Sequence, residues 1–129
     1  MKASFFKHTL NFILPGKTSR DVLSKKDSWF LVFKDEKSYG IGECSIIPGL
    51  SLDNIHEIEL KLKQVCNDIS KGEQINYGSY NQFPAVKFAI ETAHQSLEGF
   101  NPPFHLFNSD FTNSKKGIPI NGLIWMGEI

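Results

Sequence analysis

SWFLVFKDEKSYGIGEC, residues 28–44, is the stretch of sequence that decides the fold. Residues 29–33 are aromatic or aliphatic, residues 34–37 are all charged, and residues 39–44 return to an extended pattern with two glycines. Runs of β-formers on either side of a short polar segment are typical of a β-hairpin. The stretch therefore predicts two antiparallel strands joined by a turn.

A third strand is predicted upstream of this hairpin, over residues 3–14. Because side chains alternate along an extended chain, two different sets of residues lie on its two sides. One set is Phe6, His8, Leu10, Phe12 and Leu14, and the other is Phe5, Lys7, Thr9 and Asn11. This pattern predicts a half-buried strand, so that strands 3–14, 28–34 and 38–44 form one antiparallel sheet.

Thirteen residues, 15–27, separate the first two predicted strands. Hairpin loops usually have about two to five residues, so a connection of this length is either functional or mobile. It contains three neighbouring hydrogen-bond donors, Thr18, Ser19 and Arg20, and Arg20 is the only arginine in the chain. A guanidinium binds carboxylates through two parallel hydrogen bonds. Arg20 is therefore a candidate functional residue. The alternative is that Arg20 is an ordinary surface residue without a functional role.

Two amphipathic helices are predicted after the sheet. The first covers residues 52–71, with Ser51 as its cap and Asp53 in its first turn, and the second covers residues 84–98. Small residues recur every four positions along the second helix, at Ala85, Ala89 and Ala93. They predict that a large surface packs closely against it. The predicted fold class is α+β, a three-stranded antiparallel sheet packed on helices.

The C-terminal part of the chain has a different character. Residues 101–117 combine two prolines with several phenylalanines, which predicts a linker that wraps a surface. Residues 118–126 lack charge, as do strands buried on both faces of a parallel sheet. We expect one domain over residues 1–117 and the first strand of a second domain over residues 118–129. Together with the alanine-lined helix, this strand would expose an apolar area that makes the chain self-associate, through Ile120, Leu123, Ile124 and Trp125.

Composition argues against several classes of function. Fourteen basic and fourteen acidic residues give a net charge of zero, which argues against a nucleic-acid binder. No apolar run reaches the roughly 18 residues of a membrane span, so we expect a soluble, cytoplasmic protein without a membrane partner.

Residues 1–37 carry a net charge of +4, which indicates either lysines on a solvated sheet edge or a positive end that meets an anionic ligand. Cys44 and Cys66 stand far apart, which favours reduced thiols.

No self-contained active site is visible in the sequence. Metal-ligand spacing is absent among the histidines, His8, His56, His94 and His105. The glycines of residues 40–42 are not followed by the third glycine and the helix that dinucleotide binding requires. Glu43 lies in an apolar neighbourhood, and we expect it to accept hydrogen bonds from backbone amides of the adjoining loop rather than to act in acid/base catalysis.

The order of these segments resembles the enolase superfamily, in its muconate-lactonizing subgroup. Three blocks are similar to the o-succinylbenzoate synthase family of the menaquinone pathway: PGKTSRDVLSKKDSWFLVF (15–33), YGIGECSIIPGLS (39–51) and NPPFHLFNSDFTNSKKGIPINGLIWMG (101–127). Between them stands FPAVKFAIETAHQSLEG (83–99), which also fits the superfamily pattern. The resemblance extends over nearly the whole chain.

The resemblance implies an N-terminal capping domain followed by a modified TIM barrel. In that family the acid/base lysines and the three carboxylates that hold Mg²⁺ lie on later barrel strands, so this chain by itself is expected to be inactive and to bind no metal. Two loops that close over substrate, 16–27 and 46–50, carry over, as does the first barrel strand. The implied substrate-binding residues are Thr18, Ser19, Arg20, Pro48, Gly49, Leu50 and Asn121.

The implied reaction is Mg²⁺-assisted dehydration of a small anionic carboxylate, a cyclohexadiene, to o-succinylbenzoate. A muconate cycloisomerase or a dipeptide or N-acylamino acid epimerase of the same superfamily would share this cap. Outside enzymes, the alternative is a stand-alone binding module made of the sheet and the helices.

Overall fold

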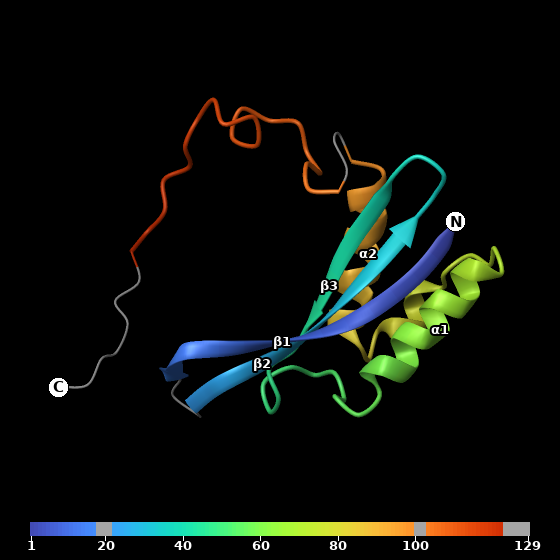
Figure 1. Cartoon of the computed structure of the whole chain (residues 1–129), viewed down its shortest axis with the longest axis horizontal. Helices are drawn as coiled ribbons and strands as arrows, with labels where there is room; N and C mark the ends of the chain where they lie inside the picture. The colour runs from blue at the N-terminus through green and yellow to red at the C-terminus, as the bar shows by residue number, and fades with distance from the viewer. Residues whose placement is uncertain (18–21, 100–102, 123–129) are drawn as a thin grey trace.

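The computed structural model describes residues 1–17, 22–99 and 103–122. Three strands form one antiparallel sheet in the order β1-β2-β3: β1 (Lys2–Lys17), β2 (Val22–Lys34) and β3 (Tyr39–Ser45). The α-helices that follow are α1 (Ile58–Ser70) and α2 (Pro84–Leu97), with a short 3₁₀ helix, η1 (Tyr77–Tyr80), between them. Figure 1 shows both α-helices beside the sheet. The predicted α+β fold, a three-stranded sheet with two helices, is confirmed.

One face of the sheet carries the core. Trp29, Leu31 and Phe33 alternate along β2 and are at most 2% exposed. Phe5 pairs with Leu31, and Cys44 pairs with Trp29, so their side chains join the same face. The buried stripes of the two helices pack on this face as well, through Ile58, Leu62, Val65 and Ile69 of α1 and Val86, Ala89, Ile90 and Ala93 of α2.

The opposite face of the sheet carries the other set of alternating side chains. Phe6 of β1 stacks on Phe30 of β2 with ring centroids 5.3 Å apart, yet Phe6 remains 55% exposed. Leu10 is also exposed on this face, whereas Ala3 and Phe5 pack against the core. The predicted strand is present, but the expectation that it is half buried over residues 3–14 is wrong in extent, since residues 6–15 are all exposed.

β1 and β2 continue past the end of β3 as a two-stranded hairpin (Figure 1). Residues 15–17 and 22–27 belong to these strands, so the expected loop over residues 15–27 is wrong in its bounds. Asn11 pairs with Lys25 and Gly16 pairs with Leu23, which leaves residues 12–15 facing Ser24 alone. Pro15 lies in this bulge, where the N–H that a proline lacks is not needed for a regular ladder hydrogen bond.

The start of the first helix also differs from the prediction. α1 begins at Ile58 instead of residue 52, and its N-cap, Glu57, makes no capping hydrogen bond through its side chain. Ser51 and Asp53 suit a helix start, but both side chains accept hydrogen bonds from other backbone amides. Ser51 is therefore used within its own turn, by the Ile47 amide, and Asp53 is used in a tertiary contact with the start of α2, so neither caps α1. α2 matches its prediction to within one residue.

Both cysteines are free thiols, as expected. Burial raises the pKa of the Cys44 thiol to about 12, and the negative charges of Asp53 and Glu43 act in the same direction. Burial also raises the pKa of Cys66. Because the thiolate is the reactive form, both cysteines are suited to packing rather than to chemistry.

The segment after α2 arcs away from the sheet and helices (Figure 1). Its first part is attached to α2, because the buried Ser96 hydroxyl donates a 2.5 Å hydrogen bond to the carbonyl of Pro103. The expectation that this linker wraps a surface is wrong for its aromatic residues, since more than half of the surface of Phe104, Phe107 and Phe111 is exposed.

The predicted barrel strand starts in a segment without regular structure, residues 118–122, in which Ile120 is exposed. Leu123, Ile124 and Trp125 lie outside the described residues. The alanine stripe of α2 is buried against β3, so the expectation that it forms part of an exposed apolar area is wrong.

Two glycines explain how α2 lies so close to β3. A methyl group on Gly42 would collide with the carbonyl group of Ala89, and one on Gly40 would collide with the backbone of Ala93 and Leu97. The helix therefore packs backbone against backbone, as its alanine stripe predicted. Ser96 adds a hydrogen bond from the Ile41 amide, 2.9 Å long, between the same two elements.

We predict that Gly42→Ala lowers the free energy of unfolding of this chain by about 3 kcal/mol, because neither backbone can move aside without disturbing the core. Gly117→Ala is the matched control, since nothing lies within 4 Å of the added methyl group; its effect should stay within about 0.5 kcal/mol. Urea denaturation measures both. Equal effects of the two substitutions would contradict the close packing.

Candidate functional site

The projecting hairpin and the segment after β3 meet around a cavity of about 220 Å³. β2 contributes Leu23, Lys25, Lys26 and Asp27, and the other wall is formed by Ile46, Ile47, Pro48 and Ile55. The two segments that the sequence singled out, 16–27 and 46–50, are therefore brought together, although residues 22–27 are strand rather than loop.

The segment from Ile46 to Ser51 is a closed turn. Ile46 is buried in the core. The Ile47 amide donates to the Ser51 hydroxyl at 2.9 Å, and the Ser51 amide donates back to the Ile47 carbonyl at 2.9 Å. Gly49 has a φ of +77°, a left-handed conformation that glycine adopts without strain. This turn leaves Leu50 59% exposed.

Asp53 fixes the far end of the same segment. Its carboxylate oxygens accept hydrogen bonds from the Ala85 amide at 3.0 and 3.2 Å and from the Val86 amide at 3.4 Å. These amides belong to the first turn of α2, where backbone N–H groups have no partner within the helix. Asp53 is only 7% exposed, so it acts as a buried cap for a helix that begins 31 residues later in the chain.

The charges on the hairpin are partly paired. Asp27 accepts hydrogen bonds from Lys7 Nζ at 2.8 Å and from Thr9 Oγ1 at 2.6 Å, and these two contacts lower the pKa of the Asp27 carboxyl. Lys26 Nζ lies 4.0 Å from Glu43 Oε1. Lys25 and Lys26 thus bring positive charge to the cavity, Asp27 brings one negative charge that is paired with Lys7, and the other lining residues are apolar. This combination suits a small organic anion with a hydrocarbon body.

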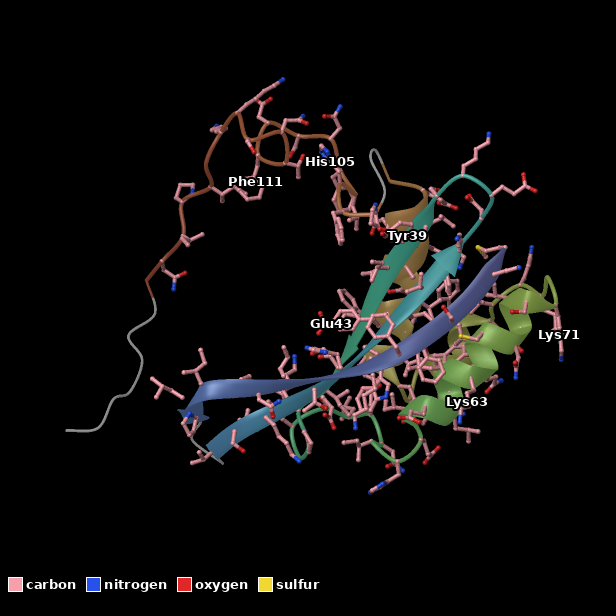
Figure 2. All side chains as sticks on the ribbon, viewed as in Figure 1. Tyr39, Glu43, Lys63, Lys71, His105 and Phe111 are labelled. Atoms are coloured by element: carbon pink, nitrogen blue, oxygen red, sulfur yellow. The ribbon has the colours of Figure 1, made fainter. Side chains whose placement is uncertain are left out.

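Glu43 has a different partner from the one expected. Its carboxylate accepts a 2.8 Å hydrogen bond from the hydroxyl of Ser28 on the neighbouring strand, not from a loop amide. The register explains this, because Glu43 pairs with Phe30 and Ser28 lies two residues from Phe30, so Ser28 and Glu43 are diagonal neighbours on the same face of the sheet. Figure 2 shows Glu43 on β3, apart from His105 and Phe111 on the C-terminal arc.

The predicted substrate-binding residues have different outcomes. Pro48 lines the cavity, and Gly49 and Leu50 belong to the adjoining turn. Asn121 is exposed in the C-terminal arc and does not line this cavity. The remaining three, Thr18, Ser19 and Arg20, lie outside the described residues.

Two lysines were missed as candidates, Lys25 and Lys26. The signal was present, because adjacent lysines follow an apolar residue, Leu23, in a segment of alternating character. They were not predicted because residues 15–27 were expected to form one loop, whereas residues 22–27 belong to β2, in which adjacent side chains point to opposite faces.

Within residues 1–17, 22–99 and 103–122, no three or more His, Cys, Asp or Glu residues gather in a way that could hold a metal ion. Over the same residues, none of the helices is both long and apolar enough for a membrane crossing.

No family model matches the chain. Among solved structures, its fold is that of enolase-type proteins. An enolase family member from Agrobacterium tumefaciens with homology to dipeptide epimerases has a TM-score of 0.60 and 18% identity, over 74% of this chain and 29% of that one. The o-succinylbenzoate synthase of Thermosynechococcus elongatus BP-1, with Mg in its active site, has a TM-score of 0.60 and 20% identity, over 75% of this chain and 30% of that one.

A relative from Desulfotalea psychrophila gives the particular assignment. The crystal structure of its MenC has a TM-score of 0.74 and 29% identity, and covers 99% of this chain and 42% of that one. Its o-succinylbenzoate synthase is 34% identical over 160 aligned positions, which cover 99% of this chain. The chain is thus a homologue of o-succinylbenzoate synthase, with structural neighbours in the enolase superfamily. It spans 43% of the length of that relative.

The contacts of Asp27 predict how its pKa changes on substitution and how the stability of the chain depends on pH. Lys7→Met should raise the pKa of Asp27 towards its ordinary value near 3.8, and Thr9→Val should raise it less, because Lys7 is the larger cause. Since the folded-state pKa is lowered, the stability that Asp27 contributes is present above that ordinary value and is lost as the pH falls through the folded-state pKa. Carboxyl NMR titration measures these values.

Asp35 is the internal control for this titration. Backbone amides of Ser38 and Lys37 lower the pKa of Asp35, and neither hairpin substitution touches them. A pKa of Asp27 that stays unchanged in Lys7→Met would refute the assigned cause.

Proposed function

We propose that this chain is the substrate-capping part of an enzyme that resembles o-succinylbenzoate synthase. The observation that carries the proposal is homology to such a synthase across 99% of the chain, together with a TM-score of 0.74 to MenC from the same organism. In this proposal the whole enzyme is a cytoplasmic lyase that dehydrates a small anionic cyclohexadiene carboxylate, with no nucleic-acid or membrane partner.

The residues of this chain would bind and cover the substrate. Lys25 and Lys26 would attract its carboxylates, while Pro48 and the exposed Leu50 would cover its hydrocarbon ring and exclude water. A cover of this kind favours reaction, because charges interact more strongly when water is excluded. Asn121 is proposed to face the site from the first barrel strand of the whole enzyme, although it is exposed in this structure.

The metal belongs to another part of the enzyme in this proposal. Among residues 1–17, 22–99 and 103–122, no three or more His, Cys, Asp or Glu residues gather in a way that could hold Mg²⁺. When bound, Mg²⁺ supplies a Lewis acid that stabilises negative charge as the proton next to the carboxylate leaves. We propose that its ligands and the acid/base lysines lie in the region that corresponds to the remaining length of the Desulfotalea relative.

A chimera tests this function. The chain replaces the matching 43% of the Desulfotalea synthase, and the chimera is assayed with the cyclohexadiene carboxylate. We expect o-succinylbenzoate to form, formation to stop with EDTA, and excess Mg²⁺ to restore it. The 129-residue chain alone and the remaining part of the synthase alone serve as controls and should be inactive. A folded chimera without turnover, or turnover by the chain alone, would contradict the proposal.

Dipeptide epimerisation is the second candidate, because an enolase family member with homology to dipeptide epimerases shares the fold, with L-Ala-L-Glu bound in that structure. Its identity of 18% and TM-score of 0.60, against 29% and 0.74 for the MenC structure, favour the first candidate. The same chimera assayed with L-Ala-L-Glu separates the two, since epimerisation without dehydration would support the second.

We also propose that Arg20 binds a carboxylate of the substrate, since the family resemblance assigns its segment to the cover. An arginine–carboxylate pair contributes about 1.5–3 kcal/mol, which corresponds to roughly ten- to a hundredfold in affinity. Arg20→Ala in the chimera should raise KM by that factor with a smaller change in kcat. Arg20→Lys should recover part of the loss, because an ammonium lacks the planar fork. A KM for Arg20→Ala within about twofold of the unsubstituted chimera would remove Arg20 from the site.

A further inference from the structure

We propose that Asp53 is a positioning residue that holds the turn of residues 46–52 against the substrate cavity. This inference rests on the proposed function for its kinetic consequence, whereas its structural part stands on this chain alone. The inference is based on two observations. The buried carboxylate of Asp53 lies at the end of the segment that lines the cavity, and it accepts hydrogen bonds from backbone amides in the first turn of α2.

The turn is attached at both of its ends. At one end Ile46 follows β3 directly and is buried in the core. At the other end Asp53 bonds to the amides of Ala85 and Val86. Between these two points Leu50 is 59% and Leu52 is 86% exposed. Two leucines are thus held out of the core by a segment whose ends are fixed.

The attachment point is itself rigid. α2 cannot slide along the sheet, because its backbone lies directly over Gly40 and Gly42 of β3. Asp53 therefore ties the turn to the same strand from which the turn starts, by way of the helix. The Ser51–Ile47 hydrogen bonds fix the shape of the turn, and the Asp53 bonds fix its place.

The position of the carboxylate favours a role beyond simple capping of α2. A helix whose N-cap is Phe83, with no side-chain acceptor of its own, receives its acceptor from a residue that is distant in sequence. Loss of Asp53 would leave α2 packed through its alanine stripe and its core residues. The turn, by contrast, would lose its second attachment, and the cavity wall formed by Ile47 and Pro48 would move with it.

Hydrogen exchange of this chain tests the structural part. Asp53→Ala should raise the exchange rates of the Leu50 and Ser51 amides, relative to core amides such as Leu31, by about tenfold, since a released segment opens locally. Asp53→Asn keeps one acceptor oxygen and should give a smaller rise. Ser96→Ala is the matched control, because Ser96 is also buried and bonds two backbone groups, but lies away from the turn.

In Ser96→Ala, the ratio of turn to core exchange should remain that of the unsubstituted chain. An unchanged ratio in Asp53→Ala would overturn the positioning role, whatever the activity of the enzyme.

Kinetics of the active chimera test the functional part. Asp53→Ala should raise KM for the cyclohexadiene carboxylate by about tenfold while kcat changes by less than about threefold, because the turn contacts substrate away from the reacting bond. Ser96→Ala should leave KM within about twofold. If exchange in the turn rises but KM does not, the turn is no part of the substrate cover, and the inference is overturned. If the unsubstituted chimera is inactive, the proposed function fails, while the exchange result still decides the attachment of the turn.

Discussion

The close approach of α2 to β3 is the constraint on which the rest of the described structure depends. Gly40 and Gly42 remove every side-chain atom from the inner face of β3 at the point where Ala89 and Ala93 arrive. Because both surfaces are nearly bare backbone, the helix has one position along the strand. That position sets the location of the first turn of α2, and hence of the amides that Asp53 reaches across the fold.

The helices stabilise one face of the sheet, so the projecting hairpin depends on its own contacts. Beyond β3, the strands β1 and β2 are held together by their ladder and by side chains such as Lys7, Thr9 and Asp27. The Phe6–Phe30 stack supports the same ladder from the opposite face. A two-stranded ribbon is only marginally stable alone, which explains why its cross-strand ion pair and hydrogen bond lie where the third strand ends.

Sequence reasoning reached the three antiparallel strands, the presence of both helices and the alanine contact, because alternation and helical periodicity are local signals that the core enforces. It failed at Asp53 and Ser51, since a capping residue looks the same whether its helix is next in sequence or 31 residues away. It also failed at residues 15–27, where the Pro15-Gly16 pair looks like a turn although a bulge carries it within a strand. For the candidate site, the family resemblance pointed to Pro48, which lines the cavity, and to Gly49 and Leu50 in the adjoining turn, and their role in substrate binding stays a prediction. Lys25 and Lys26 became candidates only with the register of β2.

The excess positive charge of residues 1–37 is explained by where its members lie. Lys2 and Lys34 are paired across β1 and β2 at one end of the sheet, beside the acidic turn of Asp35 and Glu36. Lys25 and Lys26 lie towards the opposite end, at the cavity. The charges that sum to +4 therefore do not act together on one anion, since charges more than about 10 Å apart are screened from each other at physiological salt. The total charge of this half of the chain is therefore no evidence for an anion site by itself, and only the positive charges of Lys25 and Lys26 are placed at the cavity among the described residues.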